Sequence, residues 1–176
     1  LNIFTSSPRR KENLSKFLMK ALPFEISSLN FHDIRGNIQT RLKKLEDSEF
    51  DGLVIAKAAL DRLLIAETKA ESEIGSFRQN LEKFMWMVVP CSQNPCAPGQ
   101  GALAIEVKSG NKKVIELLNK INNLDVFEDV QEEREKLKKY GGGCHQKIGV
   151  SIENHPLGKV ITEKGLTPKN KIIDKR

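Results

Sequence analysis

The feature that most constrains the fold is the alternation of short apolar runs with amphipathic helical segments in the first part of the chain. Residues 1–4 and 51–56 are interpreted as strands. The second is a continuous apolar run, which is typical of a buried parallel strand. Apolar residues at helical spacing follow the first strand, and a helix is predicted over 57–64 after the other. Strands that alternate with helices predict an α/β layer.

The first strand leads into a helix start that carries two arginines. Ser7 can cap a helix that begins at Pro8, so Arg9 and Arg10 fall in its first turn. Cations are unfavourable there because the helix dipole favours negative charge at this end. Free N–H groups at a helix start can also bind an anion. A solvated pair of arginines is the alternative, and this turn alone favours neither interpretation.

A second turn repeats the arrangement. A strand is predicted from Phe31, and Asn37 can cap the helix that follows it. Arg35 lies just before this cap, and Arg41 lies in the first turn or just past it. Arginine is the side chain suited to bidentate recognition of carboxylates and phosphates. The two turns together therefore predict a ligand with several carboxylate or phosphate groups.

The middle of the chain predicts two more strands around a structured loop. Residues 84–89 are apolar and are interpreted as a strand, and residues 101–107 are interpreted as another, buried strand. The segment between them, 90–101, is rich in proline and glycine and predicts a structured loop. The last third has apolar residues at helical spacing over 114–121 and 126–137. Three strand-like runs follow, at 146–152, 159–162 and 171–173. Two helices followed by three strands predict a small α+β domain.

A charged helical run ends in glycines directly before Cys144. Because glycine permits positive φ and close approach to the backbone, this stretch predicts a helix end and a thiol at the tip of a loop, open to alkylation. The alternative is a helix C-cap followed by a small buried cysteine, since cysteine is among the most buried residue types. Taken alone, the stretch favours the alternative.

Composition narrows the function classes. The 176-residue chain has a net charge of +6, which suits either a nucleic acid or an anionic small molecule as a partner. Aromatic residues make up only 6% and are not interleaved with a basic stripe, which argues against a stacking platform for single strands. No apolar run has the length of a membrane span, so we expect no membrane association.

The cysteine pattern bears on compartment and metal binding. The chain has three cysteines, an odd number that argues against a disulfide framework and for a reducing compartment, the cytoplasm. Cys91 and Cys96 have no second pair at the spacing that a zinc site uses, so we expect no metal site.

Six segments, in the same order over nearly the whole chain, closely resemble the porphobilinogen deaminase (hydroxymethylbilane synthase) family. They are residues 5–10 (Thr-Ser-Ser-Pro-Arg-Arg), 34–42, 50–56, 60–63, 98–102 (Pro-Gly-Gln-Gly-Ala) and 142–144 (Gly-Gly-Cys). The resemblance implies a periplasmic-binding-protein-like α/β domain over 1–85. It implies a return segment over 86–110 that would pair with an N-terminal domain, and a small α+β domain with a three-stranded sheet over 111–176, short at its C-terminal end.

The resemblance also implies a function. Members of the family are transferases that condense four porphobilinogen molecules stepwise onto a cysteine-linked dipyrromethane with loss of ammonia, in tetrapyrrole (haem) biosynthesis. Cys144 would carry the dipyrromethane through a thioether. The side chains that would hold its acetate and propionate groups, and those of the growing linear polypyrrole, are Ser7, Arg9, Arg10, Arg35 and Arg41. Arg62 and Gln100 would contact the substrate.

In the family the catalytic aspartate lies in an N-terminal domain, which has no counterpart in this sequence. We therefore expect no catalytic residue in this chain and no activity from the chain alone. The N-terminal domain would be a partner in cis or in trans, and the complete protein would be a monomer. Two alternatives stay open: a catalytically inactive anion-binding fragment of such an enzyme, and a basic nucleic-acid-binding protein.

Overall fold

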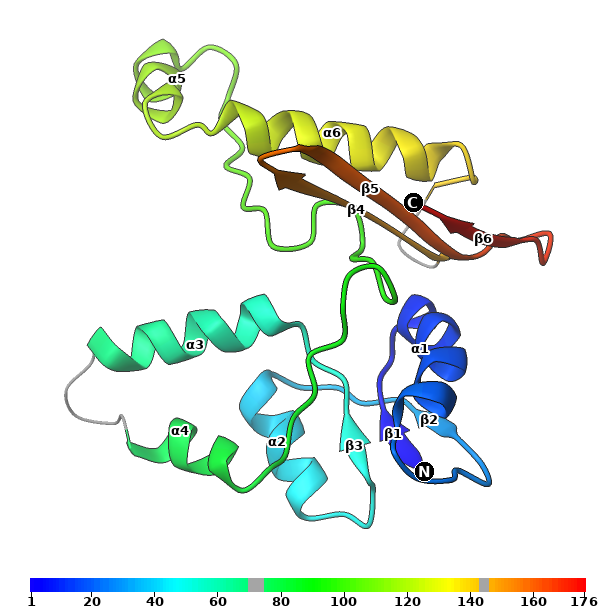
Figure 1. Cartoon of the computed structure of the whole chain (residues 1–176). Coiled ribbons are helices and arrows are strands. Elements are labelled where there is room, and N and C mark those ends of the chain that lie inside the picture. Colours follow the sequence, from blue (N-terminus) through cyan, green and yellow to red (C-terminus); the bar gives the residue numbers. More distant parts are fainter. Residues whose placement is uncertain (70–74, 143–145) are drawn as a thin grey trace.

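Two small sheets, each with its own helices, make up the computed structural model, which describes residues 1–69, 75–142 and 146–176 (Figure 1). The first sheet is parallel with strand order β2-β1-β3, and the second is antiparallel with order β4-β5-β6. The predicted mixture of an α/β part and a second part with a three-stranded sheet is therefore confirmed. The strands are β1 (Asn2–Phe4), β2 (Asn30–His32), β3 (Gly52–Leu53), β4 (Lys147–His155), β5 (Gly158–Leu166) and β6 (Ile172–Lys175).

The first sheet is short but has the predicted parallel pairing. Ile3 of β1 is in register with Phe31 of β2 on one side and with Gly52 of β3 on the other. The strand predicted over 51–56 is reduced to the two residues of β3, which are half-buried rather than buried. The chain leaves the sheet after Val54, whose N–H donates to the Phe4 carbonyl at 3.0 Å.

Four helices accompany this sheet, and their apolar faces form two clusters. Ile3 packs with Leu14 and Leu18 of the first helix, and Leu42 packs with apolar residues of the three later helices. Burying each such side chain contributes about 1.5–3 kcal/mol, so these faces determine how the helices lie against the sheet. The helices are α1 (Pro8–Ala21), α2 (Ile38–Glu46), α3 (Lys57–Lys69) and α4 (Gly75–Glu82).

The second sheet has the predicted order of two helices followed by three strands. The helices are α5 (Lys112–Asn119) and α6 (Leu124–Lys138). Ile148, Val150 and Ile173 form the core of this part, and Leu137 and Tyr140 pack against them. Figure 1 shows α6 running along the sheet. The turn between β4 and β5 closes at the His155–Gly158 pair.

The strands predicted over 84–89 and 101–107 are wrong. Residues 85–90 and 102–108 have no regular structure, and most of their apolar side chains face outward: Met85 is 101% exposed and Leu103 is 87% exposed, whereas Val89 packs against the Ile3 cluster. An apolar run needs a neighbouring strand to become part of a sheet, and within the described ranges neither segment has one. The structured loop predicted over 90–101 is confirmed, with turns held by hydrogen bonds such as Gln93 N–H to the Pro90 carbonyl (2.9 Å).

The two parts meet where α1 contacts β4 and β5. Asn13 Nδ2 donates to the Lys164 carbonyl at 3.5 Å, and Lys147 Nζ lies 3.9 Å from a Glu12 carboxylate oxygen. The helix that begins at the first arginine pair thus adjoins the start of β4. No helix within the described ranges has the length and apolar character that a membrane crossing requires.

Candidate functional site

The parallel sheet brings the two arginine-bearing turns to one edge. Carboxyl ends of parallel strands lie at the same edge of a sheet, where ligands of open α/β sheets bind. The turn before α1 follows β1, and the turn before α2 follows β2. Ser6 joins them directly, since its Oγ accepts the Ile34 N–H at 2.8 Å and donates to the Ile34 carbonyl at 2.8 Å. The two predicted arginine-bearing turns therefore adjoin each other at this edge and form one candidate site.

Both predicted helix caps are confirmed. Ser7 Oγ accepts the backbone N–H of Arg10 at 3.4 Å, and Asn37 Oδ1 accepts that of Thr40 at 2.8 Å. Each cap satisfies one of the free N–H groups of its helix. The Ser7 cap also holds the backbone of Arg10 in the first turn of α1.

Arg10 and Arg41 lie close enough to repel each other. Arg10 is half-buried, and its Nη1 donates to the Val54 carbonyl at 3.2 Å, just beyond β3. Burial lowers the pKa of Arg10, and the positive charge of Arg41 lowers it further. Arg41 Nε donates to the Gly36 carbonyl at 2.7 Å. Two guanidinium groups from different helices thus lie near enough at the sheet edge for their charges to interact.

Arg9 occupies a different environment. Its side chain is buried, with a residue exposure of 5%, so the solvated-pair alternative is wrong for this arginine. Its guanidinium donates to Asn94 Oδ1 at 3.0 Å, to the Pro95 carbonyl and to Gln100 Oε1 at 3.4 Å. Burial, followed by the charge of Arg10, lowers the pKa of Arg9 to about 10. Arg9 therefore stays charged at neutral pH while it ties α1 to the 90–101 loop.

The arginines at this edge form no ion pair with an acidic side chain among the described residues, although Asp33 lies near enough to Arg35 for their charges to interact. Within the part of the chain that the structure describes, the ion pairs involve lysines and a histidine, and none of the predicted carboxylate-binding arginines pairs with an acidic side chain. Clustered like charges without partners are unfavourable unless an anion neutralises them. The edge is therefore suited to a ligand with several negative groups. The arginines concerned are Arg9, Arg10, Arg35 and Arg41.

The remaining predicted arginines are exposed. Arg35 lies in the turn between β2 and α2, and its backbone carbonyl accepts Lys44 Nζ at 3.0 Å. Arg62 lies on α3, and no described hydrogen bond or ion pair joins its side chain to the cluster at the sheet edge. The structure thus brings Arg35 to the same edge as Arg10 and leaves Arg62 on the surface of the helix that follows β3.

Gln100 lies beside Arg9, although 91 residues separate them in sequence. It is exposed, and its Nε2 also points at Cys96 Sγ at 3.7 Å. The sequence did not indicate which residues hold this loop. They include Asn94, Pro95 and Glu133, whose carboxylate accepts the Gly99 N–H at 2.7 Å. A glutamate on a charged helix looks like any solvated residue, so no local signal could have found it.

Cys144 lies outside the described residues, and its predicted role stays a prediction. On its N-terminal side the glycines end α6 as expected, with Gly141 at φ 104° and Gly142 at φ 65°. The Gly142 N–H donates to the Leu137 carbonyl at 3.3 Å. On the other side, Gln146 Nε2 donates to the carbonyls of Gly142 (2.9 Å) and Tyr140 (3.1 Å). The flanks of the cysteine are therefore tied together.

The other two cysteines are free and half-buried. Burial, followed by the neighbouring Cys96, raises the pKa of Cys91 to about 11. A thiol with a raised pKa is a poor nucleophile at neutral pH. Among the described residues, no group of three or more histidine, cysteine or acidic side chains gathers in a way that could hold a metal ion.

Comparison with known proteins identifies the family. The family model for "Porphobilinogen deaminase, dipyromethane cofactor binding domain" matches residues 1–116. The chain belongs to the porphobilinogen deaminase family. The matched range includes all the arginines at the sheet edge and Gln100, whereas Cys144 lies beyond it.

Three porphobilinogen deaminases give the extent of the similarity. The protein from Caldicellulosiruptor saccharolyticus is 40% identical over 149 residues, which is 84% of this chain and 42% of that protein. The protein from Prochlorococcus marinus (strain MIT 9312) is 37% identical over 131 residues, 73% of this chain and 36% of that protein. The protein from Dictyostelium discoideum is 35% identical over 155 residues, 87% of this chain and 40% of that protein. The chain thus spans only 36–42% of the length of these porphobilinogen deaminases.

Proposed function

We propose that this chain is the cofactor-holding part of a porphobilinogen deaminase, or hydroxymethylbilane synthase. The complete protein would condense four porphobilinogen molecules stepwise, with loss of ammonia, into a linear tetrapyrrole. The observation that carries the proposal is the cluster of arginines at one sheet edge without acidic partners among the described residues. It coincides with a family whose matched domain is described as binding dipyromethane.

The residues at this edge fit a dipyrromethane with acetate and propionate side chains. Such a group carries several carboxylates, and Arg10 and Arg41 are two cations held near each other by backbone carbonyl acceptors. Charge-assisted N–H to carboxylate contacts are about twice as strong as neutral hydrogen bonds. A bound carboxylate would also relieve the repulsion between the two guanidinium groups.

Each predicted binding residue has a distinct part in this proposal. Arg10, Arg35 and Arg41 would contact carboxylates of the cofactor and of the growing chain. Ser7 would act mainly through its cap, which fixes the first turn of α1. The guanidinium of Arg9 already donates three hydrogen bonds to other groups of the protein. It would therefore contribute a fixed positive charge and hold the 90–101 loop. The substrate-contacting residues would be Gln100 and Arg62.

Cys144 would hold the dipyrromethane through a thioether. When bound, the dipyrromethane supplies the terminal pyrrole carbon to which the first substrate unit is joined. Cys144 precedes Lys147 in the sequence by three positions, and Lys147 lies beside Glu12, one helical turn beyond Arg9. This proximity of the start of β4 to α1 supports a cofactor that is attached in the second part of the chain and bound by the arginines of the first.

We further propose three segments for the chain. Residues 1–85 would be a periplasmic-binding-protein-like domain, and residues 111–176 the small cofactor domain. Residues 86–110 would return from an N-terminal domain of the complete protein, with which they would pair. The exposure of the apolar side chains in and beside this segment supports such pairing, because large apolar groups in water mark a surface that another element covers. They are Met85, Trp86, Leu103 and Ile105.

The test of the proposed function is a mass and colour measurement on the complete protein that contains this chain. The intact protein should weigh more than its sequence by one dipyrromethane, and an Ehrlich-type reagent should detect the pyrrole. Cys144→Ser should abolish both signals, whereas Cys91→Ser and Cys96→Ser, as matched controls, should keep them. An adduct that peptide mapping places on Cys91 or Cys96, or an unmodified Cys144 in active enzyme, would contradict the assignment.

A further inference from the structure

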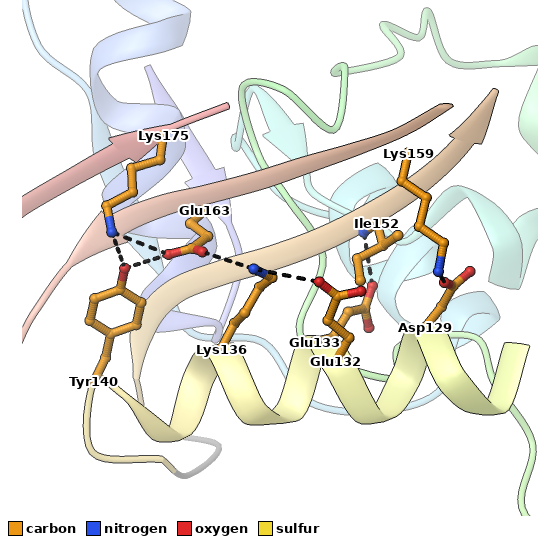
Figure 2. A network of polar contacts seen from close by, with 9 residues as sticks. All are labelled: Asp129, Glu132, Glu133, Lys136, Tyr140, Ile152, Lys159, Glu163 and Lys175. Atoms are coloured by element: carbon orange, nitrogen blue, oxygen red, sulfur yellow. Dashed lines mark hydrogen bonds and ion pairs between the residues drawn. The ribbon is translucent and has the colours of Figure 1, made fainter. Parts of the chain in front are cut away.

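Glu133 of α6 joins three separate segments of the chain. One carboxylate oxygen accepts the Gly99 N–H at 2.7 Å, and the other accepts the Ile152 N–H in β4 at 3.1 Å. Figure 2 shows the contact to Ile152, with Glu133 turned toward the strand. Glu133 is half-buried between these partners. A single side chain therefore fixes the turn at residues 98–101 to both the helix and the sheet.

Only a carboxylate can make both contacts. An ionised glutamate has acceptor oxygens and no donor, so each oxygen can take one N–H. Glutamine has the same shape, but its NH₂ group would face one of the two N–H donors. Burial raises the pKa of Glu133, and the N–H groups of Gly99 and Ile152 act in the opposite direction. The two donated hydrogen bonds therefore offset part of the burial of the charge, and burial remains the larger effect on the pKa.

The 98–101 turn also sits closely on α6. Gly99 has φ 73°, and a Cβ at that position would lie 3.4 Å from Val130 and 3.8 Å from Arg134. Val130, Glu133 and Arg134 share one face of the helix by their spacing. The next residue along the turn is Gln100, whose Oε1 accepts Arg9 Nη2 at 3.4 Å. The position of Gln100 thus depends on how Gly99 is held.

We infer that Glu133 is a positioning residue. It holds Gln100 and Arg9 in the positions in which they bind the substrate and the growing polypyrrole. The inference rests on the proposed function, because it gives Glu133 an effect on substrate binding through Gln100. Glu133 itself would touch neither the substrate nor the polypyrrole, since its hydrogen bonds go to the backbone N–H groups of Gly99 and Ile152. Its role would be to keep the 98–101 turn in one place while the chain elongates.

The neighbouring residue provides a matched control. Glu132 lies on the same helix, and its carboxylate is 3.5 Å from Lys136 Nζ in a network that extends to Glu163 (Figure 2). No described hydrogen bond joins Glu132 to the 98–101 turn. Glu132→Gln changes the net charge by the same amount as Glu133→Gln and leaves the turn untouched.

The experiment uses the complete protein with Glu133→Gln, Glu132→Gln and each change combined with Gln100→Ala. Losing a buried N–H partner should raise the KM for porphobilinogen roughly tenfold in Glu133→Gln, with a smaller change in kcat. Glu132→Gln should match the wild-type KM. In the Gln100→Ala background, Glu133→Gln should raise KM no further, because the residue through which it acts has gone. Hydrogen exchange at the Gly99 amide should become faster in Glu133→Gln and should stay unchanged in Glu132→Gln.

Two results would overturn the role of Glu133 and leave the proposed function standing. One is an unchanged KM in Glu133→Gln, and the other is an equal rise in KM when Glu133→Gln is made in the wild type and in the Gln100→Ala variant. The second would mean that Glu133 acts only on general stability. If Glu133→Gln does not fold, Glu133→Asp takes its place, since the shorter carboxylate keeps the charge and cannot reach both N–H groups. Failure of the complete wild-type protein to form hydroxymethylbilane would instead overturn the proposed function, and the role of Glu133 with it.

Discussion

Gly149 of β4 lies so close to Pro95 that a Cβ at position 149 would stand 2.3 Å from the Pro95 carbonyl oxygen. The same carbonyl accepts a hydrogen bond from the buried Arg9, and the adjacent Val150 N–H donates to the Cys96 carbonyl at 3.0 Å. The loop at Pro95 and Cys96 therefore connects α1, which carries Arg9, to β4. Glycine at position 149 is required by this approach, not by an unusual φ.

Gly149→Ala should destabilise the protein. The clash is with backbone, so the loop or the strand must move, and overpacking of this kind costs about 1–3 kcal/mol. Urea unfolding of the complete protein would measure the change in the free energy of unfolding. Gly110→Ala is the control, because a Cβ there meets nothing within 4 Å. Equal midpoints for the two variants would show that the loop yields without cost.

Arg41→Lys should weaken binding of the polypyrrole although it keeps the positive charge, and Arg35→Lys should act in the same direction. Lysine is a point charge and cannot reproduce the planar fork of arginine. In Arg41 the Nε already donates to Gly36 at 2.7 Å, and lysine has no second nitrogen to replace both contacts. The expected loss is roughly 1.5–3 kcal/mol, the range for a hydrogen bond to a charged group. Elongation rates in the complete enzyme would measure it.

The control for these arginine variants is Arg176→Lys, an exposed position beyond β6. It makes the same chemical change away from the sheet edge and should leave elongation unaltered. Wild-type elongation in Arg41→Lys would mean that this residue does not hold a carboxylate.

The lowered pKa of Asp129 predicts that the protein loses stability in acid. The hydrogen bond from Lys159 (2.7 Å), helped by that from Asn154 (2.5 Å), lowers the pKa of Asp129. A carboxyl whose pKa is lower in the folded state stabilises the fold above its unfolded pKa. This contribution is lost as the pH falls through the folded pKa. Asp129→Asn should therefore reduce stability at neutral pH and should narrow its gap to the wild type below about pH 4.

Unfolding midpoints between neutral and acidic pH would measure the gap for Asp129→Asn. The matched control is Glu135→Gln, an exposed acid on the same helix for which the described residues provide no hydrogen-bond or ion-pair partner. A gap that stays constant with pH would contradict the role given to the Lys159 contact.

The arginine turns could be predicted because their signals are local. A capping serine or asparagine, a proline at the first helical position and the apolar spacing after it all lie within a few residues of each other. Ser7 and Asn37 cap as expected, and the short strands before them place Arg10 and Arg41 at one edge. The parallel pairing followed from the order of strands and helices.

The loop contacts could not be predicted because they join residues far apart in the sequence. Arg9 meets Pro95 across 86 positions, and Glu133 meets Gly99 across 34. Nothing in the sequence near Arg9 distinguishes a guanidinium that binds a ligand from one that binds a loop. The apolar runs near Met85 and Leu103 were interpreted as strands for a related reason: apolar character indicates that a segment is covered, and does not say by which part of the protein.

The chain alone should form no hydroxymethylbilane, whereas the complete protein should. Joining a substrate unit requires proton transfer to the departing amine from a positioned acid. Two acids that the sequence offers in the turns of the parallel sheet, Asp33 and Asp51, are committed elsewhere. Lys11 donates to Asp33 at 2.8 Å and lowers the pKa of Asp33, so this carboxyl holds no proton to give at neutral pH. Asp51 accepts the Asn2 N–H at 2.7 Å and so helps to tie β1.

A discontinuous assay of purified chain and complete protein, at equal concentration and with excess porphobilinogen, would test this expectation. The chain should bind the reaction product or an analogous polycarboxylate through its arginines and yet show no turnover. Arg41→Lys should weaken that binding in the chain as it does in the complete protein, which separates loss of catalysis from loss of folding. Turnover by the chain would contradict the prediction. It would point to a carboxyl among these 176 residues that replaces the aspartate expected in the N-terminal domain.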